Sequence, residues 1–229
     1  MNRRFCIILC VTACLGVAVP SPAGEVLDRI VATVNGHIIL QSDWEDSLRN
    51  AACVDGRPPG QLTAEERKAA LDHLIDQELL REQMHASDFQ HASDKDVAQR
   101  MAEIRQQHPG AESPSGWHAV LDHCGTTESE LKQYVALQLD LMQLVDARLR
   151  PAVNIDSKSI ESYYNQEFLP QLRQSGGQDV PLAQVSPKIK ELLTQQKVNE
   201  LLVAWLQNLR SGSSIRKELP PIDSPGEMR

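Results

Sequence analysis

Residues 30–40 read IVATVNGHIIL, and this stretch decides how the fold begins. Two apolar runs, 30–34 and 37–40, flank the dipeptide Asn35-Gly36. Asn-Gly favours a type I′ turn because both central residues of that turn need a positive φ. The stretch therefore predicts a β-hairpin. An isolated hairpin is barely stable in water, so we expect a third strand or a helical layer to cover it.

Helical patterns dominate the rest of the chain, and most of them carry a start signal. A capping box is a Ser or Thr followed three residues later by Glu, and each residue caps the backbone of the other. A single Ser or Asp caps other starts, and a proline suits the first helical position. The predicted boxes are Ser42 with Glu45, Thr63 with Glu66 and Thr127 with Glu130; the single caps are Ser93, Asp156 and Ser186, which precedes Pro187.

Two stretches near the end of the chain interrupt the helical pattern. Residues 169–185 hold Pro170, Gly176-Gly177 and Pro181, which predicts a connector. Residues 214–219 suit a closing strand, and we expect the proline-containing tail 220–229 to be disordered. The predicted fold class is therefore mainly α, with a small N-terminal hairpin that pairs with a C-terminal strand.

The N-terminus has the layout of a secretory signal peptide. Arg3 and Arg4 precede an uncharged run, residues 5–19, and small residues that end at Ala23 offer a cleavage site. The run is shorter than the roughly 20 residues that a membrane-spanning helix needs. We therefore expect residues 1–23 to be removed and the protein to be exported without an integral membrane span. An alternative is lipidation at Cys14, because residues 11–14 resemble a lipobox.

The charge of the chain bears on which ligands it binds, and its cysteines bear on whether it holds a disulfide. The formal net charge is −8, which argues against nucleic-acid binding, because that needs clustered Lys and Arg. After cleavage Cys53 and Cys124 are the cysteines that remain, and disulfides persist outside the cytoplasm. They form either a bridge or two small buried apolar residues.

No catalytic, cofactor or metal motif emerges. His118, His123 and Cys124 lie close together, but the two histidines are five positions apart and fall on different sides of a helix. Glu45 and its acidic neighbours suit a helix N-terminus better than a catalytic carboxylate pair. We therefore expect a protein that is not an enzyme and needs no cofactor.

Several segments, in this order, resemble the SurA-type periplasmic chaperones. Residues 26–43 are similar to the opening hairpin of that family, and 76–84 to its "I-D-x-x-L-L-x-Q" helix. The stretch 127–146 is similar to its long last N-domain helix and 156–164 to its "D-x-x-I-x-x-Y-Y" segment. The end of the chain, 188–219, is similar to the helix and strand with which such chaperones finish.

One departure from the family pattern matters. Family members usually carry parvulin-type prolyl isomerase domains between the Tyr-Tyr helix and the C-terminal helix, where this chain has only residues 169–185. A domain takes about 50 residues or more, so no parvulin fits there. The resemblance then implies residues 24–168 as an N-terminal domain, 169–185 as a connector and 186–219 as a helix and strand packed on that domain.

The resemblance implies an ATP-independent periplasmic chaperone without isomerase activity. Its partners would be unfolded exported proteins, chiefly outer-membrane proteins, which it would bind in an apolar groove between the N-terminal helical layer and the C-terminal helix. Tyr163, Tyr164 and Phe168 are candidate client contacts, and core packing is the other interpretation of these three aromatics. A second hypothesis for the whole protein is an accessory module of the cell envelope that holds one dedicated partner.

Overall fold

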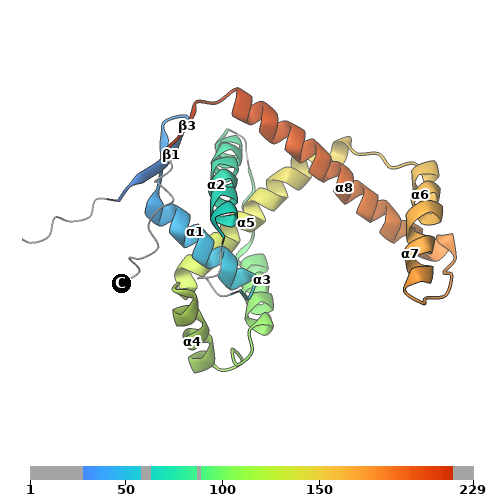
Figure 1. Cartoon of the computed structure of the whole chain (residues 1–229), viewed down its shortest axis with the longest axis horizontal. Helices are drawn as coiled ribbons and strands as arrows, with labels where there is room; N and C mark the ends of the chain where they lie inside the picture. Colours follow the sequence, from blue (N-terminus) through green and yellow to red (C-terminus); the bar gives the residue numbers. More distant parts are fainter. Residues whose placement is uncertain (1–27, 58–62, 87–88, 219–229) are drawn as a thin grey trace, which may run out of the picture.

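The computed structural model describes residues 28–57, 63–86 and 89–218. The predicted signal peptide 1–23, the alternative lipidation site Cys14 and the tail 220–229 lie outside the described residues. Helices form most of the described fold, and a small sheet lies at one end of it, which confirms the predicted fold class (Figure 1). No helix within these ranges is long and apolar enough to cross a membrane.

The sheet joins the two ends of the described chain. Strands β1 (Ile30–Val34) and β2 (His37–Leu40) form the hairpin, and Asn35 and Gly36 have φ values of 50° and 91°, as a type I′ turn requires. Strand β3 (Ile215–Lys217) pairs antiparallel with β1, so the strand order is β2-β1-β3. The turn also holds the start of β3, because the Asn35 N–H donates to the carbonyl of Ser214 at 2.9 Å. The predicted partner strand of the hairpin is confirmed.

The helices form a bundle and an arm. The bundle consists of α1 (Gln41–Val54), α2 (Ala64–His85), α3 (Asp94–Gln107), α4 (Pro114–Cys124) and α5 (Glu128–Leu149). A short 3₁₀ turn, η2 (Arg150–Ala152), follows α5. The arm consists of α6 (Ser157–Tyr163), the π-helical segment η3 (Tyr164–Phe168), α7 (Leu169–Gln174) and α8 (Leu182–Ser211).

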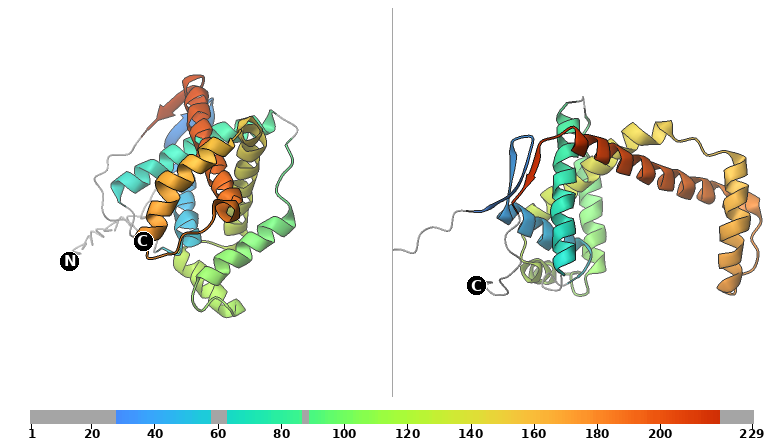
Figure 2. Two further views of the ribbon diagram at one scale, coloured as in Figure 1. Left: turned by 90° about the vertical axis from the view of Figure 1, so that its right-hand side faces the viewer. Right: turned by 45° about the horizontal axis from the view of Figure 1, so that its top comes forward.

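The arm projects from the bundle. Figures 1 and 2 show α8 leaving the bundle beside the sheet and reaching α6 and α7, which lie far from the hairpin. Helix α8 therefore returns the chain from the distant tip to the sheet.

Most predicted helix starts are confirmed. Thr63 with Glu66 and Thr127 with Glu130 form reciprocal capping boxes, and Asp156 accepts from the Ser159 N–H at 2.7 Å. The box predicted at Ser42 and Glu45 is wrong. Helix α1 begins at Gln41, two residues earlier than a cap at Ser42 implies, because Asp43 accepts the Leu40 N–H at 2.9 Å and thereby satisfies the free backbone donor before the helix.

The boundaries predicted around the connector are also wrong. Residues 164–174 continue the helix that Asp156 starts, because a π-helical turn carries the backbone past Phe168 into α7. Helix α8 begins at Leu182, and Pro187 lies inside it rather than at its first position. The first turn of a helix tolerates proline because its first four N–H groups have no helical partner. Pro187 lies just beyond that first turn.

Three apolar clusters hold the bundle together, and the chain ends contribute to two of them. The first joins the sheet to α1 and α2, with Leu209 and Ile215 packed against its edge. The second lies between α1, α3, α4 and α5 and contains Cys53 and Cys124. The third joins α2 and α5, where Trp205, Leu206 and Leu209 of α8 pack against it. One end of α8 is thus part of the core.

The buried amide of Gln77 should weaken the fold. Gln77 is 4% exposed, and its amide nitrogen has no hydrogen-bond partner among the described residues. An unsatisfied buried donor costs about 1–3 kcal/mol. We expect Gln77→Met, which keeps the volume and removes the donor, to raise the free energy of unfolding by about 1 kcal/mol in urea titrations.

The exposed Gln106 of α3 supplies the matched control. Gln106→Met makes the same chemical change on a helix surface and should leave the free energy of unfolding within about 0.5 kcal/mol of the wild type. A destabilised Gln77→Met protein would show that the Gln77 side chain is satisfied in solution.

Candidate functional site

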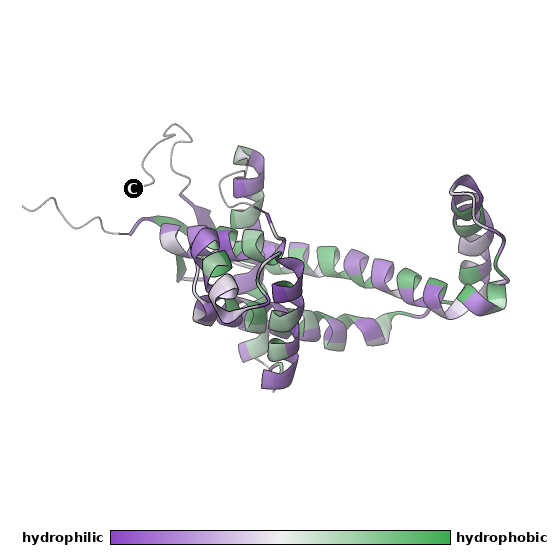
Figure 3. Ribbon diagram, turned by 90° about the horizontal axis from the view of Figure 1, so that it is seen from below, coloured by the Kyte–Doolittle hydropathy of each residue, from purple (hydrophilic) through white to green (hydrophobic). Residues whose placement is uncertain are grey.

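Helix α8 carries exposed apolar side chains along its length. Only Ile189 and Val198 of its 30 residues are buried. Leu192 and Val203 are 42% and 56% exposed, although both are large apolar residues. In Figure 3 apolar (green) and polar (purple) segments follow one another along the whole projecting helix. A helix of this composition normally hides its apolar side chains, so α8 has apolar area available for another chain.

The sheet end of α8 is fixed to the bundle by charged groups. Arg210 donates from Nε to Asp76 Oδ1 at 2.6 Å and from a guanidinium nitrogen to the Asp72 carbonyl at 2.8 Å. Lys217 of β3 forms an ion pair with the Asp72 carboxylate. We refer to Asp72, Asp76, Arg210 and Lys217 as the α2 clamp. It joins the last helix and strand to the middle of α2.

The positive residues of the clamp also shift the pKa of Asp72. Burial raises the pKa of Asp72, but the hydrogen bond and positive charge of Lys217, together with Arg210, outweigh burial and lower that pKa below its ordinary value. A carboxylate with a lowered pKa stabilises the folded state at pH values above its unfolded pKa. This stability is lost as the pH falls through the folded pKa, that is, below about pH 4.

We therefore expect Asp72→Asn to lower the free energy of unfolding by about 1 kcal/mol at pH 7. The difference from the wild type should shrink as urea titrations move from pH 5 to pH 3. Asp122→Asn on the surface of α4 is the control, because Asp122 is exposed and has no ion pair within the described ranges. Equal losses for the two variants at every pH would contradict the assigned role of the clamp.

The middle of α8 rests on the end of α5. Arg148 places its guanidinium carbon 4.8 Å from the centre of the Trp205 ring. Arg150 reaches further along α8, where its Nη1 lies 2.9 Å from Glu191 Oε1, and it also pairs with Asp146 at 3.2 Å. These contacts position α8 through long polar side chains, and although Val198 is buried, Leu192 and Val203 stay exposed.

Contacts among its own residues hold the tip of the arm together. Tyr164 donates from its hydroxyl to the Val180 carbonyl at 2.7 Å and stacks on Phe168, with ring centres 5.8 Å apart. Tyr163 precedes them and is half-buried, as the other two rings are. A bidentate pair between Arg173 and Asp179 spans the turn that leads into α8. The three predicted aromatics thus lie together at the tip, and their role toward a client stays a prediction.

The two cysteines meet inside the second cluster. Cys53 at the end of α1 and Cys124 at the end of α4 form a disulfide, with their Cα atoms 5.6 Å apart. His108 points its Nε2 at the Cys53 carbonyl at 2.7 Å. Both cysteines are buried. The bridge cross-links α1 to α4 within the bundle and does not involve the arm.

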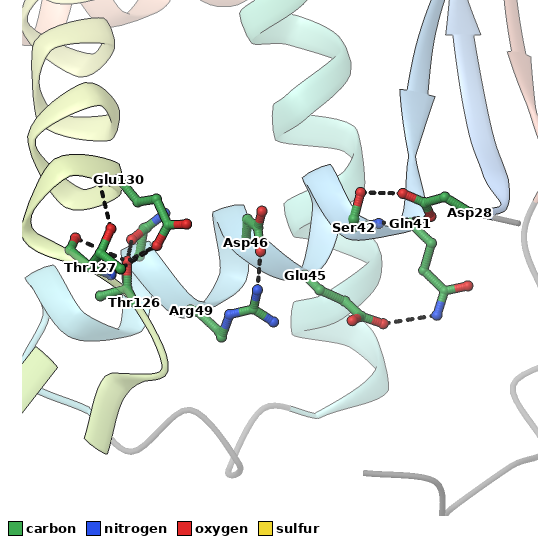
Figure 4. A network of polar contacts seen from close by, with 10 residues as sticks. Asp28, Gln41, Ser42, Glu45, Asp46, Arg49, Thr126, Thr127 and Glu130 are labelled. Carbon is green, nitrogen blue, oxygen red and sulfur yellow. Dashed lines mark hydrogen bonds and ion pairs between the residues drawn. The ribbon is translucent and has the colours of Figure 1, made fainter. Parts of the chain in front are cut away.

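The acidic residues at the start of α1 have structural partners (Figure 4). Glu45 accepts from the Gln41 side chain at 2.8 Å, and Asp46 pairs with Arg49. Burial, and after it the charges of Glu130 and other nearby carboxylates, raise the pKa of Asp46 despite that arginine. Across the described ranges no group of three or more His, Cys, Asp or Glu side chains could hold a metal ion.

Two hollows of the described surface lie away from α8. One, of about 380 Å³, lies beside the disulfide between Arg57, His108 and His123. The other, of about 430 Å³, lies between α3 and α5 around Leu139 and Met142. Neither is lined by a residue of α8, so neither is the groove predicted between the helical layer and the C-terminal helix.

The sequence pattern did not identify Leu192 and Val203 as site residues. Leu192 belongs to the apolar stripe within residues 189–209, which is the signal that predicts the helix itself, whereas Val203 lies outside that stripe. Nothing in that stripe distinguishes the residues that pack on the bundle from those that stay exposed.

Comparison with known proteins gives two matches. A family described as "SurA-like N-terminal domain" matches residues 4–145. The curated protein "Chaperone SurA" of Nitrosococcus oceani (strain ATCC 19707 / BCRC 17464 / JCM 30415 / NCIMB 11848 / C-107) is 25% identical over 201 residues, which cover 83% of this chain. The match spans 45% of the length of that relative.

Proposed function

Since the chain belongs to the SurA-like N-terminal domain family, we propose that it is an ATP-independent periplasmic chaperone. Its clients are unfolded segments of exported proteins, chiefly outer-membrane proteins, and they bind on the exposed apolar surface of α8. The observation that carries this proposal is a helix of 30 residues, rich in Leu and Val, with only two residues buried.

The energetics of this surface suit reversible binding. Burying apolar area contributes about 25 cal/mol per Å², so one half-exposed Leu or Val contributes about 1 kcal/mol when a client covers it. A few such contacts hold an unfolded segment weakly, and the segment can leave again to fold. Contacts of this kind are non-directional, so they accept many client sequences.

The aromatics of the tip extend this surface in the proposal. Tyr163, Tyr164 and Phe168 are half-buried, which leaves part of each ring accessible. A ring with one free face offers rigid apolar area at a small entropic cost. We assign these three residues a secondary role, in which they contact aromatic side chains of the client.

The proposal includes no isomerase activity. Between α6 and α8 the chain holds the segment η3, α7 and a turn closed by the pair of Arg173 with Asp179. This length leaves no room for a parvulin domain at that point of the chain. A proline-isomerisation assay on a model peptide should therefore give the uncatalysed rate, and clear acceleration would contradict this part of the proposal.

The test of the chaperone activity is aggregation of a denatured porin. The porin is diluted from urea into buffer with and without the purified protein, and light scattering is followed without ATP. We expect scattering to fall as the protein approaches stoichiometric excess. Unchanged scattering would overturn the proposal and favour the accessory module that holds one dedicated partner.

A further inference from the structure

The outer edge of β3 has free backbone hydrogen-bonding groups. The Glu218 N–H donates to the Val31 carbonyl and the Asn35 N–H donates to the Ser214 carbonyl, both at 2.9 Å. Hydrogen-bonded pairs alternate along an antiparallel ladder, so Arg216 exchanges its backbone bonds with Thr33. The N–H and C=O groups of Ile215 and Lys217 therefore point away from β1. They have no hydrogen-bond partner among the described residues.

The opposite edge of the sheet, strand β2, has fewer free backbone hydrogen-bonding groups. On β2 the alternation leaves the backbone groups of Ile38 pointing outward. The next outward N–H, that of Leu40, is occupied by the Asp43 carboxylate at 2.9 Å. A further strand would find two consecutive pairing positions on β3 and one on β2, so β3 is the edge that can be extended.

The side chains of β3 determine which strand fits. Arg216 lies on the outer face of the sheet, in one row with Thr33 and Ile38. Ile215 and Lys217 point to the other face, where Ile215 packs against the first cluster and Lys217 pairs with Asp72. Arg216 is exposed and forms no ion pair within the described part of the chain. Its guanidinium is therefore available to a residue directly opposite it.

Charge disfavours a second copy of this chain paired through both Ile215 and Lys217. If two β3 edges paired about a two-fold axis at Arg216, Ile215 would pair with Lys217 of the other copy and Arg216 would face its own counterpart. Residues opposite each other in a non-hydrogen-bonded pair are the closest across a ladder, and like charges there destabilise the pairing. A carboxylate at that position stabilises it.

We infer that β3 accepts an extended client segment as a fourth strand, with a carboxylate opposite Arg216 and an apolar residue opposite Ile215. This addition of a strand to a sheet edge obtains affinity from backbone hydrogen bonds and selectivity from alternate side chains. The inference rests on the proposed function in one respect, namely that the added strand belongs to a client. It assigns that client a second contact, apart from the apolar surface of α8.

Two capped peptides test the charge requirement. Both consist of eight alternating threonine and valine residues, except that one has a central glutamate and the other a central lysine. At about 0.15 M salt we expect the glutamate peptide to bind the wild type about fivefold more tightly than the lysine peptide. The order should reverse in Arg216→Glu. The overall charge of −8 favours the lysine peptide, so a preference for that peptide in the wild type would overturn the inference.

A proline variant tests the backbone pairing. Lys217→Pro removes an N–H that points away from β1, a position where an edge strand tolerates proline. Lys217→Ala is the matched control, since it loses the same ion pair with Asp72 and keeps the N–H. We expect the glutamate peptide to bind Lys217→Pro about fivefold more weakly than it binds Lys217→Ala. In the wild type, the bound peptide should slow hydrogen exchange of the Ile215 and Lys217 amides. Equal affinities, or a wild-type dimer that Lys217→Pro dissociates, would overturn the inference.

The two proposals fail separately in these experiments. Absent peptide binding together with suppressed porin aggregation overturns the β3 assignment and leaves the chaperone proposal standing. Peptide binding together with unchanged porin aggregation supports the β3 assignment and overturns the chaperone proposal.

Discussion

Replacing both Cys53 and Cys124 with alanine should lower the free energy of unfolding by about 4 kcal/mol. The bridge spans a sequence separation of 71 residues, and closing so long a loop removes much conformational entropy from the unfolded chain. The bridge also joins the ends of α1 and α4, so its loss removes the covalent link between two helices that pack in the second cluster. Urea titrations of the oxidised wild type and the double variant measure the difference.

Reduction supplies the control for this prediction. Dithiothreitol should shift the wild-type urea midpoint close to that of the double variant and leave the variant itself unchanged. An unchanged wild-type midpoint after reduction would show that the two thiols are not bridged in the folded protein.

Replacing both Leu192 and Val203 with glutamate should abolish most of the suppression of porin aggregation. The two side chains are 42% and 56% exposed, so a client that covers them gains about 2 kcal/mol of apolar burial in total. Losing this contribution weakens client binding roughly 30-fold. Because both positions are exposed, the variant should keep the helical circular dichroism of the wild type and a free energy of unfolding within about 0.5 kcal/mol of it.

Met142→Glu is the matched control for the α8 variant. Met142 is 66% exposed, more than either α8 residue, but it lies on α5 beside the hollow that faces α3. We expect this variant to suppress aggregation as the wild type does. An equal loss in Met142→Glu would mean that any exposed apolar residue serves and that α8 has no special role.

The α8 surface and the β3 edge are close in sequence and differ in chemistry. Helix α8 offers side-chain area without direction, whereas β3 offers backbone groups at fixed spacing. The α2 clamp holds both to the bundle, because Arg210 belongs to α8 and Lys217 to β3. Loss of the clamp should therefore weaken both proposed client contacts together.

The local sequence was sufficient to predict the elements that depend on neighbouring residues. Asn35-Gly36 predicts the hairpin turn because few other dipeptides adopt two positive φ values. Thr63 with Glu66, and Thr127 with Glu130, predict helix starts because their capping bonds join residues three apart. The same reasoning is wrong at Ser42, where Asp43 caps the helix in place of the predicted Glu45, two residues further along.

Other features were decided only by tertiary structure, because they depend on contacts between residues far apart in the chain. From the sequence, Cys53 and Cys124 were either bridged or free, and packing of α1 against α4 brings them together. The stripe on α8 predicted a helix, but only the position of the bundle shows that Val198 is buried and Leu192 is exposed. Local signals act over a few residues, whereas exposure depends on where distant helices lie. The sequence by itself therefore determined the elements and their order, and the tertiary structure decided which of their surfaces remain available for a client.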